Sequence, residues 1–399
     1  MRHYGDLWMI NLIPRDHWEY KIKDFFKSIG GIAHSAKNNK LLTIDAFNQC
    51  IPVGTGRAGL VAAIRSLNLP NKAKIAVPLY CCHVVFQAIL TAGGKPCFID
   101  IDPETFCLSP ADLSNKISDC AAVIAVHMFG NTCDMLNIKA TAQGRPIIED
   151  CAQALGSKIN GQPVGSFGDI SFFSFRSGKY VSAGEGGAVY SRNYSTKIGD
   201  LIFKMPQPSR LNELGHIFKI HIKSVLRSKP FYGIFGYKLW SLASKRTSPS
   251  ENETCSLMQI HNSDFNIAGN RLPGLHSLIE RQRANANLYK TLLKLPPDMV
   301  CHEKPNTYYN RYHYPITFQF QKQRDDMATF LLSKNIDTMK YLDDIVNIAK
   351  KHFGYSGNCP IAEEYSKKVL VIPSYYSLKE KYIRYIATNL NDGWNQIGK

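Results

Sequence analysis

The chain has 399 residues, 44% of them hydrophobic, which excludes an intrinsically disordered protein and leaves room for two domains. Its 48 Lys and Arg outnumber its 32 Asp and Glu by 16, so we expect anionic partners such as phosphorylated small molecules or an acidic membrane face. The eleven cysteines are scattered and lack zinc-binding spacing, which indicates reduced thiols and no metal site. The sequence shows neither a signal peptide nor an apolar run of about 18 residues, which predicts a cytoplasmic protein.

Regular patterns begin after an N-terminal segment, residues 1–45. Between residues 50 and 190, short apolar runs alternate with helical patterns, which predicts an α/β fold with a mostly parallel sheet covered on both faces by helices. Ligands of such sheets bind beyond the carboxyl ends of the strands. The predicted strands are Lys74–Pro78, Cys97–Asp100, Ala121–His127, Pro146–Asp150, Ile170–Phe175 and Ala188–Tyr190. The predicted helices are Val84–Thr91, Pro110–Ile117 and Met135–Ala142.

Residues 191–265 interrupt this rhythm, and we interpret 201–260 as an insertion rich in basic and aromatic residues. Between 201 and 250, nine Lys or Arg accompany one acid, Glu213, so this window carries +8, half of the surplus. Three interpretations stay open: a solvated cover, a gate that supplies cations to substrate phosphates, and a patch for peripheral membrane contact. A nucleic-acid partner is not expected, because no nucleic-acid-binding module accompanies the charge.

The remaining chain changes to helical and then mixed patterns. A helical pattern begins at Ile267 and continues over Ala284–Leu293, and a strand is predicted over Tyr312–Phe318. Helices are predicted over Asp325–Ser333 and from Lys379 to about Leu390. We therefore divide the chain into a large domain, residues 46–265, and a smaller α+β domain, residues 266–399.

One lysine is placed where a catalytic side chain would be useful. Lys179 follows the predicted strand Ile170–Phe175 in a turn of small residues, with the hydroxyl of Ser174 five residues earlier. A lysine there can bond to an aldehyde cofactor if burial lowers its pKa and frees the amine. The alternative is an ordinary surface lysine in a loop. Residues Gly184–Gly187 predict the tight return into the next strand.

Further segments upstream offer complementary chemistry. Gly54-Thr-Gly-Arg57 opens a helical stretch, and the free N–H groups of such a turn suit a phosphate; a plain helix cap is the alternative. Asp150 ends a predicted strand, where a carboxylate can hold a pyridine nitrogen protonated, or else cap a helix. Gln153, three residues later, can direct its amide to a ring hydroxyl.

These segments resemble the core signature of the DegT/StrS sugar aminotransferases, which are fold-type I enzymes that use pyridoxal 5'-phosphate. The resemblance is carried by IIEDCAQALGS, VGSFGDISFFSF, GK and GEGGAVYS between residues 146 and 191. It extends through VGTGRAGL at 53–60, VPLYCCHVVFQAILTAGGKPCFIDIDPET at 77–105 and VHMFGNTCDM at 126–135, with weaker echoes at 336–338, 359–363 and 371–373. It implies a homodimer whose active sites are shared between subunits.

The resemblance implies a role for each matched residue. Lys179 falls on the Schiff-base lysine and proton carrier, Asp150 on the partner of the pyridinium nitrogen, Gln153 on the residue near the ring hydroxyl, and Ser174 on a phosphate ligand. The phosphate-binding turn of the family falls on Gly56, Arg57 and Ala58.

The chain departs from the pattern of the family in two respects. The family usually stacks an aromatic ring on the cofactor where this chain has Cys82, so either His83, which we take as the candidate, or Tyr80 stacks, or no ring does. The asparagine that the family sends from the neighbouring subunit to the phosphate is not located, because the insertion obscures the alignment.

The resemblance also implies the reaction. Members with histidine in place of the lysine perform dehydration, so Lys179 favours transfer of an amino group. We expect glutamate as the donor and a keto group of a nucleotide-activated sugar as the acceptor, for polysaccharide or modified-sugar biosynthesis. Two alternatives stay open: a fold-type I reaction on another carbonyl compound, and a regulatory or membrane-associated protein that keeps the fold.

Overall fold

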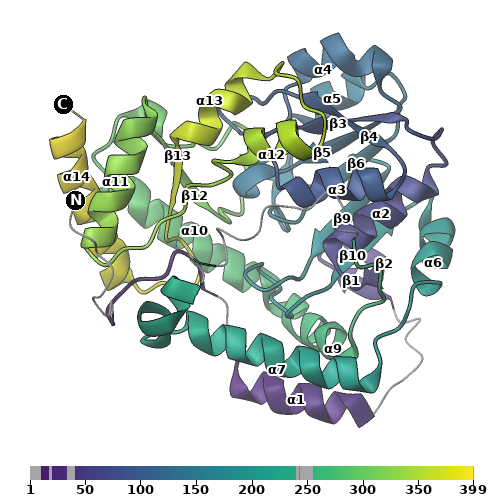
Figure 1. Cartoon of the computed structure of the whole chain (residues 1–399), viewed down its shortest axis with the longest axis horizontal. Helices are drawn as coiled ribbons and strands as arrows, with labels where there is room; N and C mark the ends of the chain where they lie inside the picture. Colours follow the sequence, from purple (N-terminus) through teal and green to yellow (C-terminus); the bar gives the residue numbers. More distant parts are fainter. Residues whose placement is uncertain (1–9, 18–19, 34–40, 240–241, 243–254, 399) are drawn as a thin grey trace.

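The computed structural model describes residues 10–17, 20–33, 41–239, 242 and 255–398. Its centre is an eight-stranded sheet in the order β1-β2-β10-β9-β6-β5-β3-β4 (Figure 1). The five strands from β9 to β4 are parallel, whereas β10 is antiparallel to both of its neighbours and β1 is antiparallel to β2. The strands are β1 (Leu42–Ile44), β2 (Phe47–Val53), β3 (Lys74–Pro78), β4 (Lys95–Ile99), β5 (Ala122–Val126), β6 (Ile147–Asp150), β9 (Ile170–Ser174) and β10 (Gly187–Ser191).

Helices cover both faces of this sheet, so the predicted α/β architecture is confirmed (Figure 1). One face is covered by α2 (Gly56–Ser66), α3 (His83–Thr91) and α6 (Ser195–Phe203), and the other by α4 (Pro110–Lys116) and α5 (Met135–Thr141). Polar side chains begin three of these helices, because the oxygens of Thr55, Ser109 and Asp134 accept the N–H three residues later.

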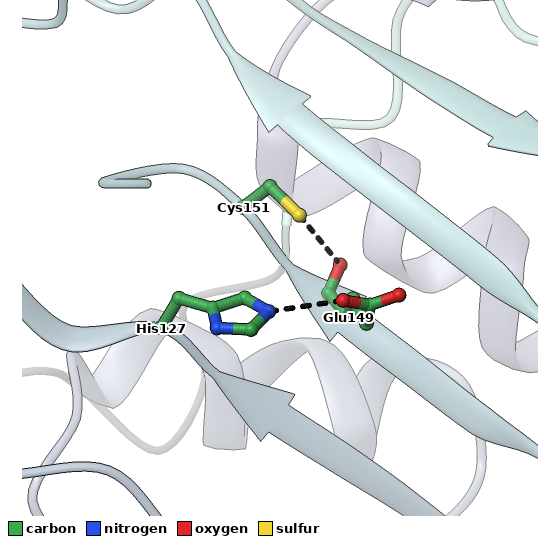
Figure 2. Close-up of side chains that lie close together, drawn as sticks. All are labelled: His127, Glu149 and Cys151. Atoms are coloured by element: carbon green, nitrogen blue, oxygen red, sulfur yellow. Dashed lines mark hydrogen bonds and ion pairs between the residues drawn. The ribbon is translucent and has the colours of Figure 1, made fainter. Parts of the chain in front are cut away.

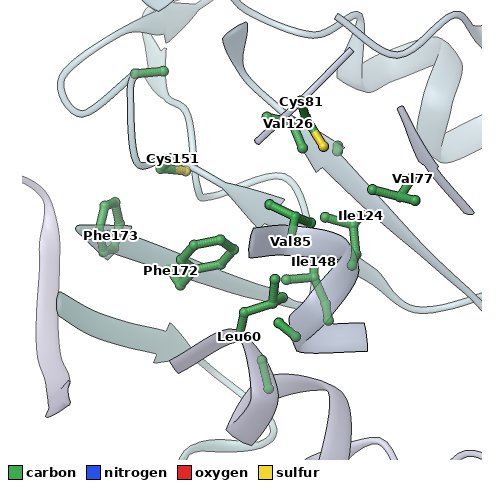
Figure 3. Packing of buried hydrophobic residues seen from close by; sticks show 14 of the residues in the cluster. Leu60, Val77, Cys81, Val85, Ile124, Val126, Ile148, Cys151, Phe172 and Phe173 are labelled. Carbon is green, nitrogen blue, oxygen red and sulfur yellow. The ribbon is translucent and has the colours of Figure 1, made fainter. Parts of the chain in front are cut away.

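The main core lies between the sheet and the helices that cover it. Leu60 of α2 and Val85 of α3 pack toward Val77, Ile124 and Ile148 of three neighbouring strands (Figure 3). Parallel strands covered on both faces read as nearly continuous apolar runs, which is why the sequence revealed them.

The insertion is mostly helical where the structure describes it. It contains α7 (Arg210–Arg227), which Ser209 caps at its start, and a short π-helical turn, η3 (Tyr232–Gly236). The N-terminal helix α1 (Ile22–Ala33) packs against both α7 and α9 (Asn262–Arg271). Residues 243–254 of the insertion lie outside the described residues.

A second core lies in the C-terminal part of the chain. The strands β12 (Tyr314–Thr317) and β13 (Val369–Ile372) pair there and pack with three helices. These helices are α10 (Leu275–Leu292), α11 (Gln321–Ser333) and α14 (Glu380–Ile397). The helices α12 (Ile345–His352) and α13 (Pro360–Lys368) instead contribute to the main core. The domain boundary at about residue 265 stays a prediction.

Three short strands that the sequence did not predict form a small separate sheet. In the order β11-β7-β8, they are Thr307–Tyr308, Lys158–Ile159 and Gln162–Pro163. Within the described residues, no helix combines the length and the apolar character needed to cross a bilayer.

Candidate active site

A pocket of about 470 Å³ opens at the carboxyl edge of the main sheet. The strand β6 ends there on Asp150, β9 ends on Ser174, and α2 begins there at Gly56. The edge is where parallel sheets bind ligands, because the strand ends and the helix N-termini meet there. Six of the eight predicted site residues line the pocket: Gly56, Arg57, Asp150, Gln153, Ser174 and Lys179.

Lys179 lies in a turn that backbone hydrogen bonds hold in place. Its N–H donates to the Arg176 carbonyl at 3.0 Å, and the Gly178 N–H donates to Ser182 Oγ at 3.0 Å. Gly178 has a φ of 93°, a conformation that glycine adopts without strain. The Lys179 amine lies 4.7 Å from the centroid of the Tyr312 ring, so the turn directs it inward.

The environment of Lys179 makes its amine reactive near neutral pH. Its pKa falls from 10.5 to about 7, because burial and, to a lesser extent, the nearby Arg176 guanidinium outweigh the opposite effect of Asp150. A large fraction of the amine is therefore neutral at pH 7, as a nucleophile or proton acceptor must be.

Asp150 is buried beside this lysine, with 6% of its surface exposed. Burial raises its pKa, while the Ala152 N–H, donated to Oδ1 at 2.9 Å, and the charge of Lys179 oppose that shift. The side chain closes a turn rather than capping a helix, so the alternative interpretation of Asp150 as a helix cap is wrong.

Gln153 is fixed by partners on two distant segments. Its Oε1 accepts the Phe129 N–H at 3.1 Å, and its Nε2 donates to the Tyr341 hydroxyl at 2.9 Å. These two bonds set the orientation of the amide. Tyr341, which also lines the pocket, was missed in the sequence because nothing local marks a tyrosine that arrives from the C-terminal part of the chain.

The N-terminus of α2 forms a cradle for an anion. Thr55 Oγ1 accepts the Ala58 N–H at 3.0 Å, and Gly56 and Arg57 at the start of the helix line the pocket, so their backbone N–H groups are the candidate donors to an anion. A Cβ on Gly56 would lie 3.3 Å from the Ser174 Cβ, so glycine allows the helix to approach the serine closely. The Ala58 N–H already donates to Thr55, so it is not available as a donor to an anion.

The Arg57 guanidinium points away from this cradle. Its Nη1 donates to Gln87 Oε1 on α3 at 3.3 Å. The contribution of Arg57 to an anion site would therefore come from its backbone N–H.

The candidates for a stacking ring are placed differently from one another. Cys82, the residue before α3, lines the pocket, whereas His83 and Tyr80 are not among its described lining residues. Tyr80 is fully buried, and its hydroxyl donates to the Tyr341 carbonyl at 3.0 Å. The assignment of His83 to the cofactor stays a prediction.

Charged side chains surround the mouth of the pocket. Arg176 and Glu185 come from the turn around Lys179, and Lys223 comes from α7 of the insertion. Burial lowers the pKa of Lys223, and the charges of Lys219 and Arg176 lower it further, while Glu185 opposes them. A supply of cations to the site was one of the three interpretations of the insertion, and only the fold identifies Lys223 as a residue of the pocket.

These residues fit pyridoxal phosphate. A pocket with a lysine amine, a buried carboxylate and a helix N-terminus beside a serine hydroxyl offers one partner each for an aldehyde, a pyridine nitrogen and a phosphate.

A second cluster below the pocket has a structural explanation. His127, Glu149 and Cys151 bring one possible metal-ligating atom each within 4.8 Å of one another (Figure 2). Glu149 accepts the N–H groups of Gly165, Phe167 and Gly168 at 2.6–2.8 Å, and His127 Nε2 lies 3.0 Å from Glu149. His127 Nδ1 accepts the Cys133 N–H at 3.0 Å. The carboxylate thus ties the 165–168 turn to β6, and we assign it no metal.

The sequence is similar to known families and proteins over most of its length. Residues 43–206 and 242–391 match the model of the DegT/DnrJ/EryC1/StrS aminotransferase family. A GDP-perosamine synthase of Escherichia coli O157:H7 is 26% identical over 89% of this chain and 88% of its own. A UDP-N-acetyl-3-dehydro-alpha-D-glucosamine 3-aminotransferase of Acidithiobacillus ferrooxidans is 30% identical over 92% of this chain and 90% of its own.

Solved structures share the fold. The Streptococcus pneumoniae protein Spr1654 in its PLP form superposes with a TM-score of 0.72 at 16% identity, over 97% of this chain and 99% of its own. The predicted fold-type I architecture is confirmed by this likeness.

Proposed function

The chain belongs to the DegT/DnrJ/EryC1/StrS aminotransferase family, whose members use pyridoxal phosphate, and from this premise we propose that it transfers an amino group from glutamate to a keto group of a nucleotide-activated sugar. The product would serve polysaccharide or modified-sugar biosynthesis. The observation that carries the proposal is the lysine amine with a pKa of about 7, which faces a buried carboxylate in the pocket at the sheet edge.

Each residue of the pocket has a separate role in the proposed reaction. When bound, pyridoxal phosphate supplies an electron sink for charge that develops at a substrate carbon. Asp150 holds a proton at the pyridine nitrogen, and the Gly56 and Arg57 N–H groups with Ser174 bind the phosphate. Lys179 Nζ takes a proton from one carbon and returns it to another, for which a pKa near the working pH is most effective.

The charged residues that line the pocket favour an anionic, phosphorylated acceptor. Arg176 and Lys223 place two cations there, beside the one carboxylate of Glu185. Two relatives are named for GDP- and UDP-linked sugars, which carry a pyrophosphate. We propose that Lys223 contacts this pyrophosphate.

A direct assay tests the proposal. Purified protein is mixed with pyridoxal phosphate, glutamate and a panel of GDP- and UDP-linked keto sugars, and 2-oxoglutarate and aminated sugar are measured. We expect both products in equal amounts, and a loss of about 10²–10⁴-fold in rate for Lys179→Ala. Lys223→Gln should raise KM for the nucleotide sugar and leave the half-reaction with glutamate unchanged.

Other results would select the alternatives. Turnover on a small carbonyl compound without any nucleotide sugar would favour the other fold-type I reaction. Absence of any half-reaction with glutamate or another amino acid would favour a regulatory protein. We further propose a cytoplasmic homodimer with shared active sites, which light scattering and mixed-subunit complementation would test.

A further inference from the structure

Exposed apolar side chains gather on one part of the molecule. Of the large apolar residues that the described chain exposes strongly, most lie on α1, on α7 and on the segment that follows α7. On α7 they are Leu211, Phe218, Ile222 and Val225, exposed by 80%, 50%, 57% and 38%. On α1 they are Ile22, Phe26 and Ile29, and after α7 they are Phe231, Phe235, Leu239 and Leu242.

The helix α7 has a mainly polar inner face and an apolar outer face. Ile217 and Ile220 point inward and are almost completely buried. The exposed residues recur at intervals of seven, four and three along the helix, so they form a single outward stripe. The outer face of a surface helix is normally polar, so this stripe requires a partner or a function.

The inner face of α7 is anchored firmly. His216 Nε2 lies 2.7 Å from Asp264 Oδ2, and Glu213 accepts the Ser263 N–H at 2.8 Å. Both carboxylates are buried. The helix is therefore held to the body of the enzyme, and its outward stripe is a fixed feature of the surface.

The stripe of α1 lies beside that of α7. Ile22, Phe26 and Ile29 are spaced by four and three residues, which places them on one side of α1. Phe25 joins the two helices, because its ring lies 5.3 Å from the ring of Phe218. Figure 1 shows the two helices side by side at the outer edge of the molecule, away from the main sheet.

Exposed cations flank these stripes. Lys23 and Lys27 lie on α1, and Arg210 and Lys219 lie on α7. The acids of the two helices do not balance them: Asp24 is paired with Arg271 at 2.8 Å. The other acid, Glu213, is buried on the inner face. The surface is thus apolar in its centre and basic at its rim.

We propose that the outer face of α1 and α7, which we call the membrane face, docks on the surface of an anionic lipid bilayer. Lysines are attracted to the anionic headgroups, and the apolar stripes enter the boundary between headgroups and acyl chains, as in interfacial amphipathic helices. A second copy of the chain fits less well, because a two-fold contact would bring identical basic rims together. The inference does not depend on which sugar the enzyme aminates.

Vesicle sedimentation of the full-length holoenzyme tests the proposal. We expect binding to vesicles of phosphatidylcholine mixed with phosphatidylglycerol, no binding to phosphatidylcholine alone, and weaker binding as salt rises. The triple variant Lys23→Gln, Lys27→Gln, Lys219→Gln should bind on the order of 100-fold more weakly. The double variant Phe218→Ser, Ile222→Ser should lose at least about tenfold.

A matched control separates the face from general surface polarity. Leu136→Ser removes an apolar side chain that is 58% exposed on α5, and it should leave vesicle binding unchanged. The half-reaction with amino donor checks that each variant is folded, since none of these residues lines the active-site pocket. Lack of binding to anionic vesicles at low salt would overturn the proposal. So would a double variant that binds vesicles normally but changes from dimer to monomer in light scattering, which would assign the face to a second copy.

Discussion

Two charges of opposite sign act on the pKa of the Lys179 amine. Burial and the Arg176 guanidinium favour the neutral amine, and the Asp150 carboxylate favours the protonated one. Asp150 in turn stays ionised more easily because Lys179 is near, although burial raises its pKa. Each group therefore sets the protonation state of the other, and substitutions around them should move the pH dependence in a defined direction.

Covalent capture of the cofactor should follow the titration of Lys179. Because the neutral amine is the nucleophile, the rate at which apoprotein reacts with pyridoxal phosphate should rise with pH and level off above about 7. In Arg176→Gln, the loss of a positive charge raises the pKa of Lys179, so the midpoint should shift to higher pH. Stopped-flow absorbance measures both profiles, and a wild-type midpoint near that of a free lysine would contradict the assignment.

Asp150→Asn isolates the charge of the carboxylate from its shape. The amide oxygen can still accept the Ala152 N–H, so the fold and cofactor binding should persist. Without negative charge opposite the pyridine nitrogen, the half-reaction with the proposed donor glutamate should slow on the order of 100-fold. Single-turnover absorbance gives the rate, and an unchanged value would remove Asp150 from this role.

The sequence predicted the part of the site that is local in the chain. Asp150, Ser174 and Lys179 end or follow apolar strands, and parallel strands deliver such residues to a common edge. Tyr341 and Lys223 arrive from segments whose position depends on packing far along the chain, and no local pattern encodes that position. Ala58 and His83 were predicted from the family pattern but do not line the pocket, because that pattern does not reveal whether a given N–H or ring faces it.

At the scale of elements, α7 is held by buried charge. Burial lowers the pKa of His216, but the hydrogen bond and charge of Asp264 outweigh this effect and raise it. The pKa of Asp264 is raised to about 6, because burial outweighs the opposing effect of His216. The His216 ring also stacks on His261, with centroids 3.9 Å apart. The pair joins the insertion to α9 next to the turn that carries Glu185.

Loss of one partner of this pair should be costly. His216→Gln leaves the Asp264 carboxylate buried without its imidazole, and we expect a loss of about 3–5 kcal/mol in the free energy of unfolding at pH 7. His276→Gln removes the exposed partner of Asp45, at 3.1 Å, and should cost less than about 1 kcal/mol. Urea unfolding at equal protein concentration compares the two variants, and equal losses would show that the buried pair contributes nothing special.

Element prediction succeeded where a single physical pattern dominates. Buried parallel strands such as β5 are continuous apolar runs, and their bounds agree with the sequence within about a residue or two. The two-residue strands β7, β8 and β11 are too short to show any period. The helix α7 was not predicted, because it buries polar residues such as Glu213 and His216 and exposes an apolar stripe, which is the reverse of the usual pattern of a surface helix.

At the scale of the whole molecule, the pocket is where the C-terminal part of the chain meets the main sheet. Tyr341 lies between α11 and α12, and its hydroxyl accepts the Gln153 amide, while its carbonyl accepts the Tyr80 hydroxyl. The helices α12 and α13 belong to the main core, whereas α11 packs in the second core. Tyr341 therefore links the loop between α11 and α12 to the orientation of a pocket residue.

Removing the Tyr341 hydroxyl should weaken the cofactor site without unfolding the chain. In Tyr341→Phe the ring stays, but the Gln153 amide loses its bond to an oxygen and keeps only the weaker contact of its Nε2 with Met128 Sδ and the bond of its Oε1 with the Phe129 N–H. A net hydrogen bond is worth about 1 kcal/mol, so pyridoxal phosphate should bind about fivefold more weakly. Tyr385→Phe removes a hydroxyl that donates to the Lys334 carbonyl at 3.0 Å on an exposed surface, and its affinity should equal that of the wild type. Fluorescence titration of the apoproteins measures the affinities. If both variants bind equally well, the Tyr341 hydroxyl does not control the cofactor site, and the bonds of Gln153 to Phe129 and Met128 are enough to orient it.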